Sequence, residues 1–417
     1  MTKKSRPNQS EKEKKELSSS AQKTRTETFL FLAILLFLPT QFGKHFWPDF
    51  SYISGIRVDY LSPTAYLTDL LIFTLFTYRF IKSFKIGVIN KLKKNRTLVL
   101  KSALIVGFVI TNVFFSENKP AGAYGVIKIL ELTFFSVITI RMLTELGIKF
   151  FLPVFSVAII FQSVLSIFQY INQGSLNGIF YFLGERTFSG STPGIANLSI
   201  DGNLILRPYG TFPHPNVLAG FFLIFLTVIL FNFTLKHRYA FLNISAILLG
   251  STALILTFSR LPILLWIISL GLFVFSKMNL NLRKKVLIIL LVSAAMIVAV
   301  ISYSPFYLRF AESSSLEESF VLRGKLFAQG IEIFLKNPLL GAGINNYLSG
   351  FVSFKNTFVF QPVHNIFLLT LIQMGVIGSA YLSYFLYKIC LILLKKKSTY
   401  LKLTFFYVLI IGVFDHY

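Results

Sequence analysis

Long apolar runs separated by short basic clusters constrain this chain more than any other feature. Crossing the hydrocarbon core of a bilayer takes about 20 apolar residues. The runs of this kind are roughly 28–46, 61–81, 98–115, 122–140, 150–171, 215–235, 239–258, 261–276, 286–304, 364–387 and 400–414. Because 54% of the residues are hydrophobic and only 14% are charged, a soluble domain is excluded. The pattern predicts an all-α polytopic membrane protein with about eleven transmembrane helices.

The basic residues predict how these helices are oriented. Lysine and arginine gather in six clusters: Lys3 to Arg25, Lys82 to Lys101, Arg141 to Lys149, Lys236 to Arg238, Lys277 to Lys285 and Lys388 to Lys402. With eleven spans all six fall on one face, which the positive-inside rule makes cytoplasmic. The net charge of +24 therefore reflects contact with membrane lipids and not with nucleic acid. We expect a multi-pass protein of the cytoplasmic membrane with a cytoplasmic N-terminus.

The segments outside the apolar runs divide the chain further. Residues 1–27 are polar and basic and predict a disordered cytoplasmic tail, followed by an uncleaved first span. Two outer loops are long, about 172–214 and 305–363. The chain stops at Asp415-His416-Tyr417 directly after an apolar run, so we expect that one last helix is missing. Because no repeat or pair of broken helices is visible, the pattern of a transporter is absent.

His364 is an ionisable residue at the predicted boundary between outer loop and membrane helix. Pro362 precedes it, so the helix is expected to start near His364 and to place the imidazole beside the positive end of the helix dipole. This environment favours the neutral ring, which is the form that accepts a proton as a general base. The alternative is an interfacial histidine that only caps or anchors the helix.

Two arginines lie in the long outer segments. Arg207 stands in a stretch rich in proline and glycine, which predicts a rigid approach to the sixth span. Arg323 stands at the start of an amphipathic surface helix predicted over 322–335, which ends at Asn337-Pro338. A fixed pair of guanidinium groups suits a diphosphate. The alternatives are snorkelling beside lipid phosphates for Arg207 and, for Arg323, ion pairs with Glu317, Glu318 or Glu332.

Three further residues, Arg260, His214 and Asn216, stand near predicted helix boundaries and are weaker candidates for a site. Arg260 lies at the tight outer turn between spans seven and eight, where it contacts either the substrate diphosphate or a bulk lipid headgroup. His214 is interpreted as a structural loop residue more readily than as a second base. Asn216 is expected to cap the sixth span.

Lys128 and Glu131 lie one turn apart within span four and are expected to neutralise each other.

Several chemistries lack the residues they need. The outer acids are scattered, and no metal-binding spacing of His, Cys or Asp stands at an outer boundary, so no metal site is predicted. Walker and Rossmann glycine patterns are missing, so no nucleotide cofactor is predicted either. The single cysteine, Cys390, permits no internal disulfide. The sequence thus favours a metal-free and cofactor-free reaction at the outer face.

Three separated segments resemble the O-antigen ligase and polymerase superfamily. They are the stretch from Arg207 to Gly220, the stretch from Arg323 to Gly343, and His364-Asn365 followed after nine residues by Gly375-Val-Ile-Gly378. The Ser259-Arg260 turn and the final Asp-His-Tyr stretch are also similar. Phe327 and Gln373 depart from the family, which often has a tryptophan and an acidic residue there. The match is specific over about 207–380, and the earlier spans are similar mainly in topology.

The resemblance implies a helical membrane glycosyltransferase of the type C kind. Its catalytic core would cover 207–380, between N-terminal helices at 28–206 and a C-terminal segment at 381–417. It would act on undecaprenyl-diphosphate-linked glycans at the periplasmic or outer face, by an inverting and metal-independent transfer to a hydroxyl acceptor. Carried over by position, Arg207 and Arg323 would bind the diphosphate and His364 would accept the acceptor's proton.

Other readings remain beside this one. Arg260, His214 and Asn365 are candidates for substrate binding around the three catalytic positions. A ligase and a polymerase differ only in acceptor: a lipid core or wall glycan in the first, another carrier-linked repeat in the second. A lipid-linked glycan flippase or transporter would carry charges along several spans, whereas the conspicuous charges of this chain gather at the outer boundary. A purely structural scaffold would not need two rigid arginine-bearing segments.

Overall fold

The structure is a computed structural model of the chain, and helices dominate it. It describes residues 25–84, 96–200, 203–235, 238–277, 314–350 and 361–415. The first helix covers residues 25–37. The later helices are α2 (Leu67–Phe84), α4 (Arg96–Phe114), α5 (Lys119–Leu146), α6 (Ile148–Asn172), α7 (Ile179–Phe182), α8 (Pro215–Asn232), α9 (Ala240–Leu256), α10 (Arg260–Lys277), α13 (Ser314–Lys336), α14 (Ile366–Lys395) and α15 (Thr399–Phe414).

In the described chain, short strands occur only in two connections, at residues 43–66 and 197–206. The strands are β1 (Gly43–His45), β2 (Tyr52–Ile53), β3 (Ile56–Arg57), β4 (Thr64–Tyr66), β5 (Asn197–Ile200) and β6 (Asn203–Leu206). They pair as three antiparallel two-stranded ribbons, β1 with β4, β2 with β3 and β5 with β6. One-turn helices at Asp49–Ser51 and Asp59–Leu61 complete the first connection. The prediction of a mostly helical chain is confirmed, with these ribbons added.

The helices have the composition of membrane spans. Among the described residues, α6, α8 and α14 are long and apolar enough to cross a membrane. Shorter apolar helices lie at Ser102–Phe114, Ala240–Leu256, Arg260–Ser276 and Thr399–Phe414. Together with the apolar composition they describe an integral membrane protein. The predicted span at 286–304 lies outside the described residues, and the count of about eleven stays a prediction.

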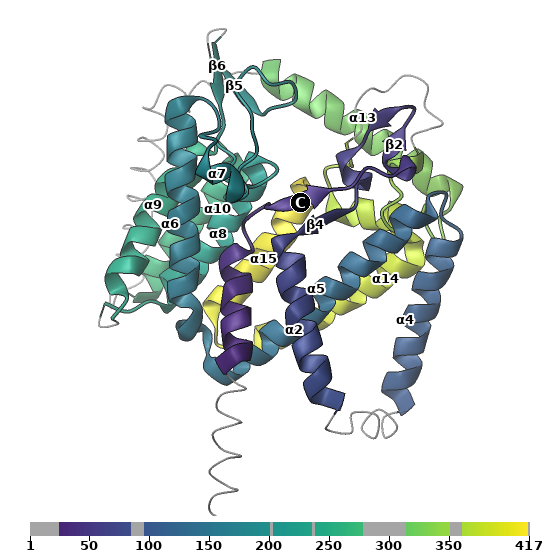
Figure 1. Ribbon diagram of the computed structural model, residues 1–417, viewed down its shortest axis with the longest axis horizontal. Helices are drawn as coiled ribbons and strands as arrows, with labels where there is room; N and C mark the ends of the chain where they lie inside the picture. The colour runs from purple at the N-terminus through teal and green to yellow at the C-terminus, as the bar shows by residue number, and fades with distance from the viewer. Residues whose placement is uncertain are drawn as a thin grey trace, which may run out of the picture.

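The helices form two groups with α15 between them (Figure 1). On one side α6, α8, α9 and α10 pack together around a large apolar core, which also receives residues of α15 and of the first helix. On the other side α4 and α5 pack against each other, and α13 packs on α14. The amphipathic α13 runs across the ends of neighbouring helices instead of parallel to them (Figure 1). This arrangement brings the starts of α8 and α14 and the end of α15 close together.

Side chains fix where three of the helices begin. Asn118 accepts a hydrogen bond from the Ala121 N–H and caps α5. His214 accepts from the Asn216 N–H at the start of α8, where Pro215 occupies the first helical position. Asn365 accepts from the Leu368 N–H and caps α14. The prediction that Asn216 caps the sixth span is therefore wrong, because the preceding histidine already supplies the cap.

Other boundaries differ from the sequence prediction. The first helix begins at residue 25 and ends at residue 37, and Gly43 already belongs to β1. Near the helix start Glu27 is buried in an ion pair with Arg79. Residues 25–27 thus belong to a helix, whereas residues 1–24 of the predicted tail lie outside the described ranges. Helix α13 begins at Ser314, so Arg323 lies in its middle and not at its start. The predicted loop 305–363 is described only at 314–350 and 361–363.

An ion cluster joins α2 to α5. Lys128 contacts the Asp69 carboxylate, and its Nζ lies 3.2 Å from Glu131 Oε2. The predicted neutralisation of Lys128 by Glu131 is confirmed, and Asp69 is a further partner that the helical spacing alone did not reveal. Because opposite charges meet within the cluster, its cost beside the hydrocarbon is reduced.

Candidate functional site

His364 is paired with an aspartate from the end of α15. Its Nδ1 lies 3.1 Å from Asp415 Oδ1, and the two side chains are only 17% and 7% exposed. Because an ionised carboxylate has only lone pairs to offer, this contact requires the hydrogen on Nδ1. In the neutral ring Nε2 is then the nitrogen with the lone pair. The pair thus has the arrangement of a base oriented by a carboxylate.

Asn216 connects this pair to Arg207. Its Nδ2 donates to Asp415 Oδ2 at 3.0 Å. Its Oδ1 accepts from Arg207 Nη2 at 2.7 Å and from the Ser259 hydroxyl at 3.0 Å. These three bonds fix which end of the amide faces which partner. A continuous chain of hydrogen bonds therefore runs from Arg207 through Asn216 and Asp415 to His364.

The segment that carries Arg207 is held by two glutamines of α6. Gln169 Oε1 accepts from the N–H groups of Tyr209 and Gly210 at 3.0 and 2.8 Å. Gln162 Oε1 accepts from the Thr211 N–H at 3.1 Å. Both glutamines are fully buried. They replace water as partners for a non-helical backbone, so the rigidity predicted from proline and glycine also depends on contacts with α6.

The turn between α9 and α10 supplies the other contacts of this network. Arg207 Nε donates to the Thr257 carbonyl at 2.8 Å, and Arg207 is 6% exposed. Phe258 has φ of 52°, in the left-handed region that a bulky residue rarely adopts. The Thr257 carbonyl before this kink accepts from Arg207, and the Ser259 hydroxyl after it donates to Asn216. Strain of this kind typically costs about 1–3 kcal/mol and is common at functional sites.

Arg323 of α13 contacts the end of α15, next to Asp415. Its Nη1 donates to the Phe414 carbonyl at 3.4 Å, directly before Asp415. Asn365 Nδ2 donates to the Val413 carbonyl at 3.0 Å while its Oδ1 caps α14. The last residues of α15 are therefore contacted from α13 and from the start of α14. The three predicted catalytic positions converge around Asp415, although they are remote in sequence.

The remaining candidates lie beside the network with different roles. His214 caps α8 through Nδ1, as expected of a structural residue. Arg260 is the first residue of α10 and follows Ser259, so it lies next to the network in sequence, and its role in substrate binding stays a prediction. Burial raises the pKa of the Tyr209 phenol. Tyr209 therefore remains neutral and does not offset the charge of Arg207.

The charges of the site favour an anionic ligand. Arg207, Arg323 and Arg260 bring three guanidinium groups, whereas Asp415 brings one carboxylate. The excess of positive charge is buried or half-buried, where its interaction with a diphosphate is stronger than in water. In the described part of the chain no group of three or more His, Cys, Asp and Glu has the geometry to hold a metal ion. The arrangement therefore combines an oriented imidazole with several fixed cations.

Sequence reasoning missed Asp415 and the role of Asn216. Asp415 had a visible signal, because an acidic residue directly after an apolar helix is costly unless it is paired. It was interpreted only as part of the chain's ending. Asn216 was assigned to capping because of its place at a helix start. Two of its partners, Ser259 and Asp415, come from distant segments, which no local pattern reveals.

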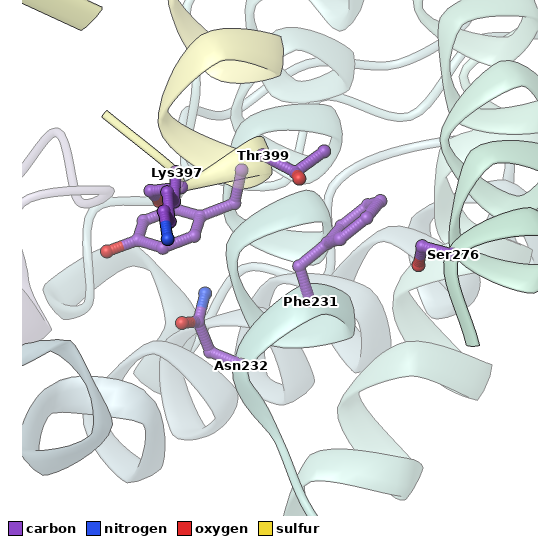
Figure 2. Close-up of a pocket in the computed structure, with 7 residues that line it drawn as sticks. Phe231, Asn232, Ser276, Lys397 and Thr399 are labelled. Atoms are coloured by element: carbon purple, nitrogen blue, oxygen red, sulfur yellow. The ribbon is translucent and has the colours of Figure 1, made fainter. Parts of the chain in front are cut away.

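A cavity of about 350 Å³ lies away from this network (Figure 2). Phe231 and Asn232 from the end of α8, Ser276 from α10, and Lys397 and Thr399 at the start of α15 line it. The network occupies the opposite ends of α8 and α15. None of the candidate site residues lines this cavity, so it is separate from the hydrogen-bonded network.

Comparison with known proteins supports the family resemblance. Residues 244–383 match the family model described as O-antigen ligase. Searches of curated proteins and of solved structures gave no match. The matched stretch contains Arg260, Arg323, His364 and Asn365, whose roles stay predictions, as do those of Arg207 and His214. Members of this family are glycosyltransferase-like enzymes of polysaccharide biosynthesis. The chain is thus an integral membrane protein, and its residues 244–383 are similar to the O-antigen ligase family.

Proposed function

We propose that this protein transfers a glycan from a polyprenyl-diphosphate donor, undecaprenyl diphosphate by resemblance, to a hydroxyl acceptor at the outer face of the cytoplasmic membrane. The observation that carries the proposal is the His364–Asp415 pair within a hydrogen-bonded network that also holds Arg207. A ligase and a polymerase share this chemistry and differ only in the acceptor.

The proposed reaction is a single displacement. The acceptor oxygen attacks the anomeric carbon, and the bond from that carbon to the diphosphate oxygen breaks. The diphosphate leaves with the electron pair, and Nε2 of His364 takes the acceptor's proton. Asp415 stabilises the resulting imidazolium. Attack from the face opposite the leaving group inverts the anomeric centre, in agreement with the expected inverting transfer.

The guanidinium groups supply the other half of the catalysis. Negative charge builds up on the diphosphate as the bond breaks, and Arg207 and Arg323 are proposed to stabilise it. Removing one such fixed donor typically costs about 10²–10³ in rate. No divalent cation is needed in this scheme, because the arginines carry out the charge neutralisation.

The decisive experiment is transfer in proteoliposomes. Purified protein receives defined diphosphate-linked glycan donors and candidate acceptors in the presence of EDTA, and products are separated by mass. We expect a glycosylated acceptor and released polyprenyl diphosphate. His364→Ala should lower turnover about 10²–10⁴-fold while donor binding is kept. Full turnover in that variant, or dependence on an added divalent cation, would contradict the mechanism.

A further inference from the structure

Helix α14 is broken in its apolar stretch. Gly375 has φ of 64° and ψ of −171°, so the helical ladder is interrupted between an outer half at Ile366–Met374 and the rest of the helix. A Cβ at this position would lie 2.2 Å from the Leu339 carbonyl oxygen. Only glycine allows this close approach. The break leaves backbone N–H and C=O groups that need partners in an apolar region.

The connection after α13 supplies those partners. Ala342 and Gly343 donate their N–H groups to the carbonyls of Ile372 and Gln373 at 2.7 and 3.0 Å. In return the Val376 N–H donates to the Pro338 carbonyl at 2.9 Å. The backbone of residues 337–343, here named the inserted loop, therefore completes the hydrogen bonding that the break interrupts.

Asn112 of α4 holds the inserted loop in the break. Its Nδ2 donates to the Leu340 carbonyl at 2.7 Å and to the Gln373 carbonyl at 3.0 Å. Its Oδ1 accepts from the Ile344 N–H at 2.8 Å. The side chain is 2% exposed. One amide thus bonds to the inserted loop, to the residue after it and to α14 on the edge of the break.

Two further asparagines, Asn118 and Asn346, bond to each other beside this contact. The Asn118 N–H donates to Asn346 Oδ1 at 2.7 Å, and Asn346 Nδ2 donates back to the Asn118 carbonyl at 3.1 Å. Asn118 also caps α5. The α4–α5 turn, which belongs to the N-terminal part of the chain, is therefore attached to the connection between α13 and α14 at two places.

These contacts lie between two candidate site residues. The inserted loop begins one residue after α13, which carries Arg323, and the outer half of α14 begins two residues after His364. Buried residues of the two helices, including Leu326 and Ile372, pack in one cluster. Because the inserted loop connects directly to α13 and is bonded to α14, its position in the break limits how these helices move relative to each other.

We infer that Asn112 is a positioning residue for glycan transfer. By holding the inserted loop in the break of α14, it fixes the placement of the Arg323-bearing helix relative to His364. It touches neither substrate nor reacting atoms in this scheme. The inference rests on the proposed function and deepens it, because it gives the N-terminal helices a role in the reaction.

The test compares Asn112→Leu with Thr111→Val in proteoliposomes. Leucine keeps the branching of asparagine at Cγ and removes its three bonds, whereas the Thr111 hydroxyl donates to the Gly107 carbonyl of its own helix. Misplacement of a catalytic group by about 1 Å can cost about 10²-fold in rate. We therefore expect kcat to fall about 10–100-fold in Asn112→Leu, with the donor KM changed by less than about 3-fold. Thr111→Val should behave as the unaltered protein.

A distance measurement tests the geometry without using activity. Spin labels at Lys325 of α13 and Ile377 of α14, in a Cys390→Ser background, span the inserted loop. We expect one narrow distance distribution in the parent and in Thr111→Val, and a broad one in Asn112→Leu. Should the leucine variant fail to fold, Asn346→Ala removes the flanking bonds and should shift both readouts in the same direction by a smaller amount.

The outcomes separate the two proposals. An unaltered protein that transfers no glycan defeats the proposed function and this inference with it. An active parent together with a folded Asn112→Leu variant of unchanged kcat defeats only the inference. A broad distance distribution with unchanged kcat also defeats it, because the placement of α13 would then not matter for turnover. A fall in kcat with a narrow distribution assigns Asn112 another role and overturns it as well.

Discussion

Helices α8 and α15 have very different surroundings at their two ends. At one end Asn216 of α8 and Asp415 after α15 take part in a network in which polar side chains bond to one another. At the other end Asn232 and Thr399 line a cavity of about 350 Å³ (Figure 2). Asn232 bonds only within its own helix, to the Val228 carbonyl at 2.8 Å.

The comparison shows that a cavity by itself does not supply catalytic groups. The cavity offers space and one exposed lysine, Lys397, without an oriented acid and base. The network fixes an imidazole, a carboxylate and guanidinium groups relative to one another. Preorganised charges contribute most to catalysis, because they need no rearrangement during the reaction. The following substitutions compare the two ends.

The largest effect is expected for Asp415→Asn. The amide keeps the size of the carboxylate but donates to Nδ1, which places the imidazole hydrogen on the wrong nitrogen. We expect kcat to fall about 10³–10⁴-fold, at the upper range for general-base catalysis. Steady-state transfer kinetics measure this. The exposed residue Asp59 provides the matched control, and equal losses in Asp59→Asn and Asp415→Asn would remove the specific role.

The second largest effect is expected for Arg207→Ala, which should lower turnover about 10²–10³-fold and weaken donor binding. Lysine at this position should not restore activity, because it cannot donate from a rigid fork to Thr257 and Asn216 together. Donor titration by fluorescence and transfer kinetics give the two quantities. Arg57, which stacks over Trp47 in the connection between the first helix and α2, serves as the control. Full rescue by Arg207→Lys would contradict the proposed geometry.

A comparison of Asn216→Ala with Asn232→Ala tests the two ends of α8 directly. The first change removes bonds to three partners and leaves buried polar groups unsatisfied, which costs about 1–3 kcal/mol of stability. The second removes a bond within one helix. We expect a lower midpoint of thermal unfolding and reduced kcat only for Asn216→Ala. Similar results for both variants would show that the network has no special importance.

The smallest effect is expected for Lys397→Ala at the cavity. An exposed side chain without a specific contact usually changes stability by less than about 0.5 kcal/mol, so transfer should stay within about 2-fold. The same proteoliposome assay measures it. A loss comparable to that of Arg207→Ala would make the cavity end part of the reaction site and weaken the contrast drawn between the two ends.

The sequence predicted most helices within a few residues, because apolar runs and helix-start residues are local signals. It placed α8 and α15 almost as they are found. It misplaced the end of the first helix, because the run after residue 37 stays partly apolar while its backbone pairs with β4. It also missed the break at Gly375, which exists only because the inserted loop comes from the preceding connection.

For the candidate site, the sequence identified residue types and tertiary structure decided their partners. His364, Arg207 and Arg323 stood out because charged groups are conspicuous beside hydrocarbon. Asn216 and Asp415 are 199 residues apart, and no periodicity relates positions at such a separation. Composition and local order thus determined a helical membrane protein and predicted cations at one membrane boundary. Packing of α8, α14 and α15 decided which carboxylate faces the imidazole, because only a folded chain brings remote segments within hydrogen-bond distance.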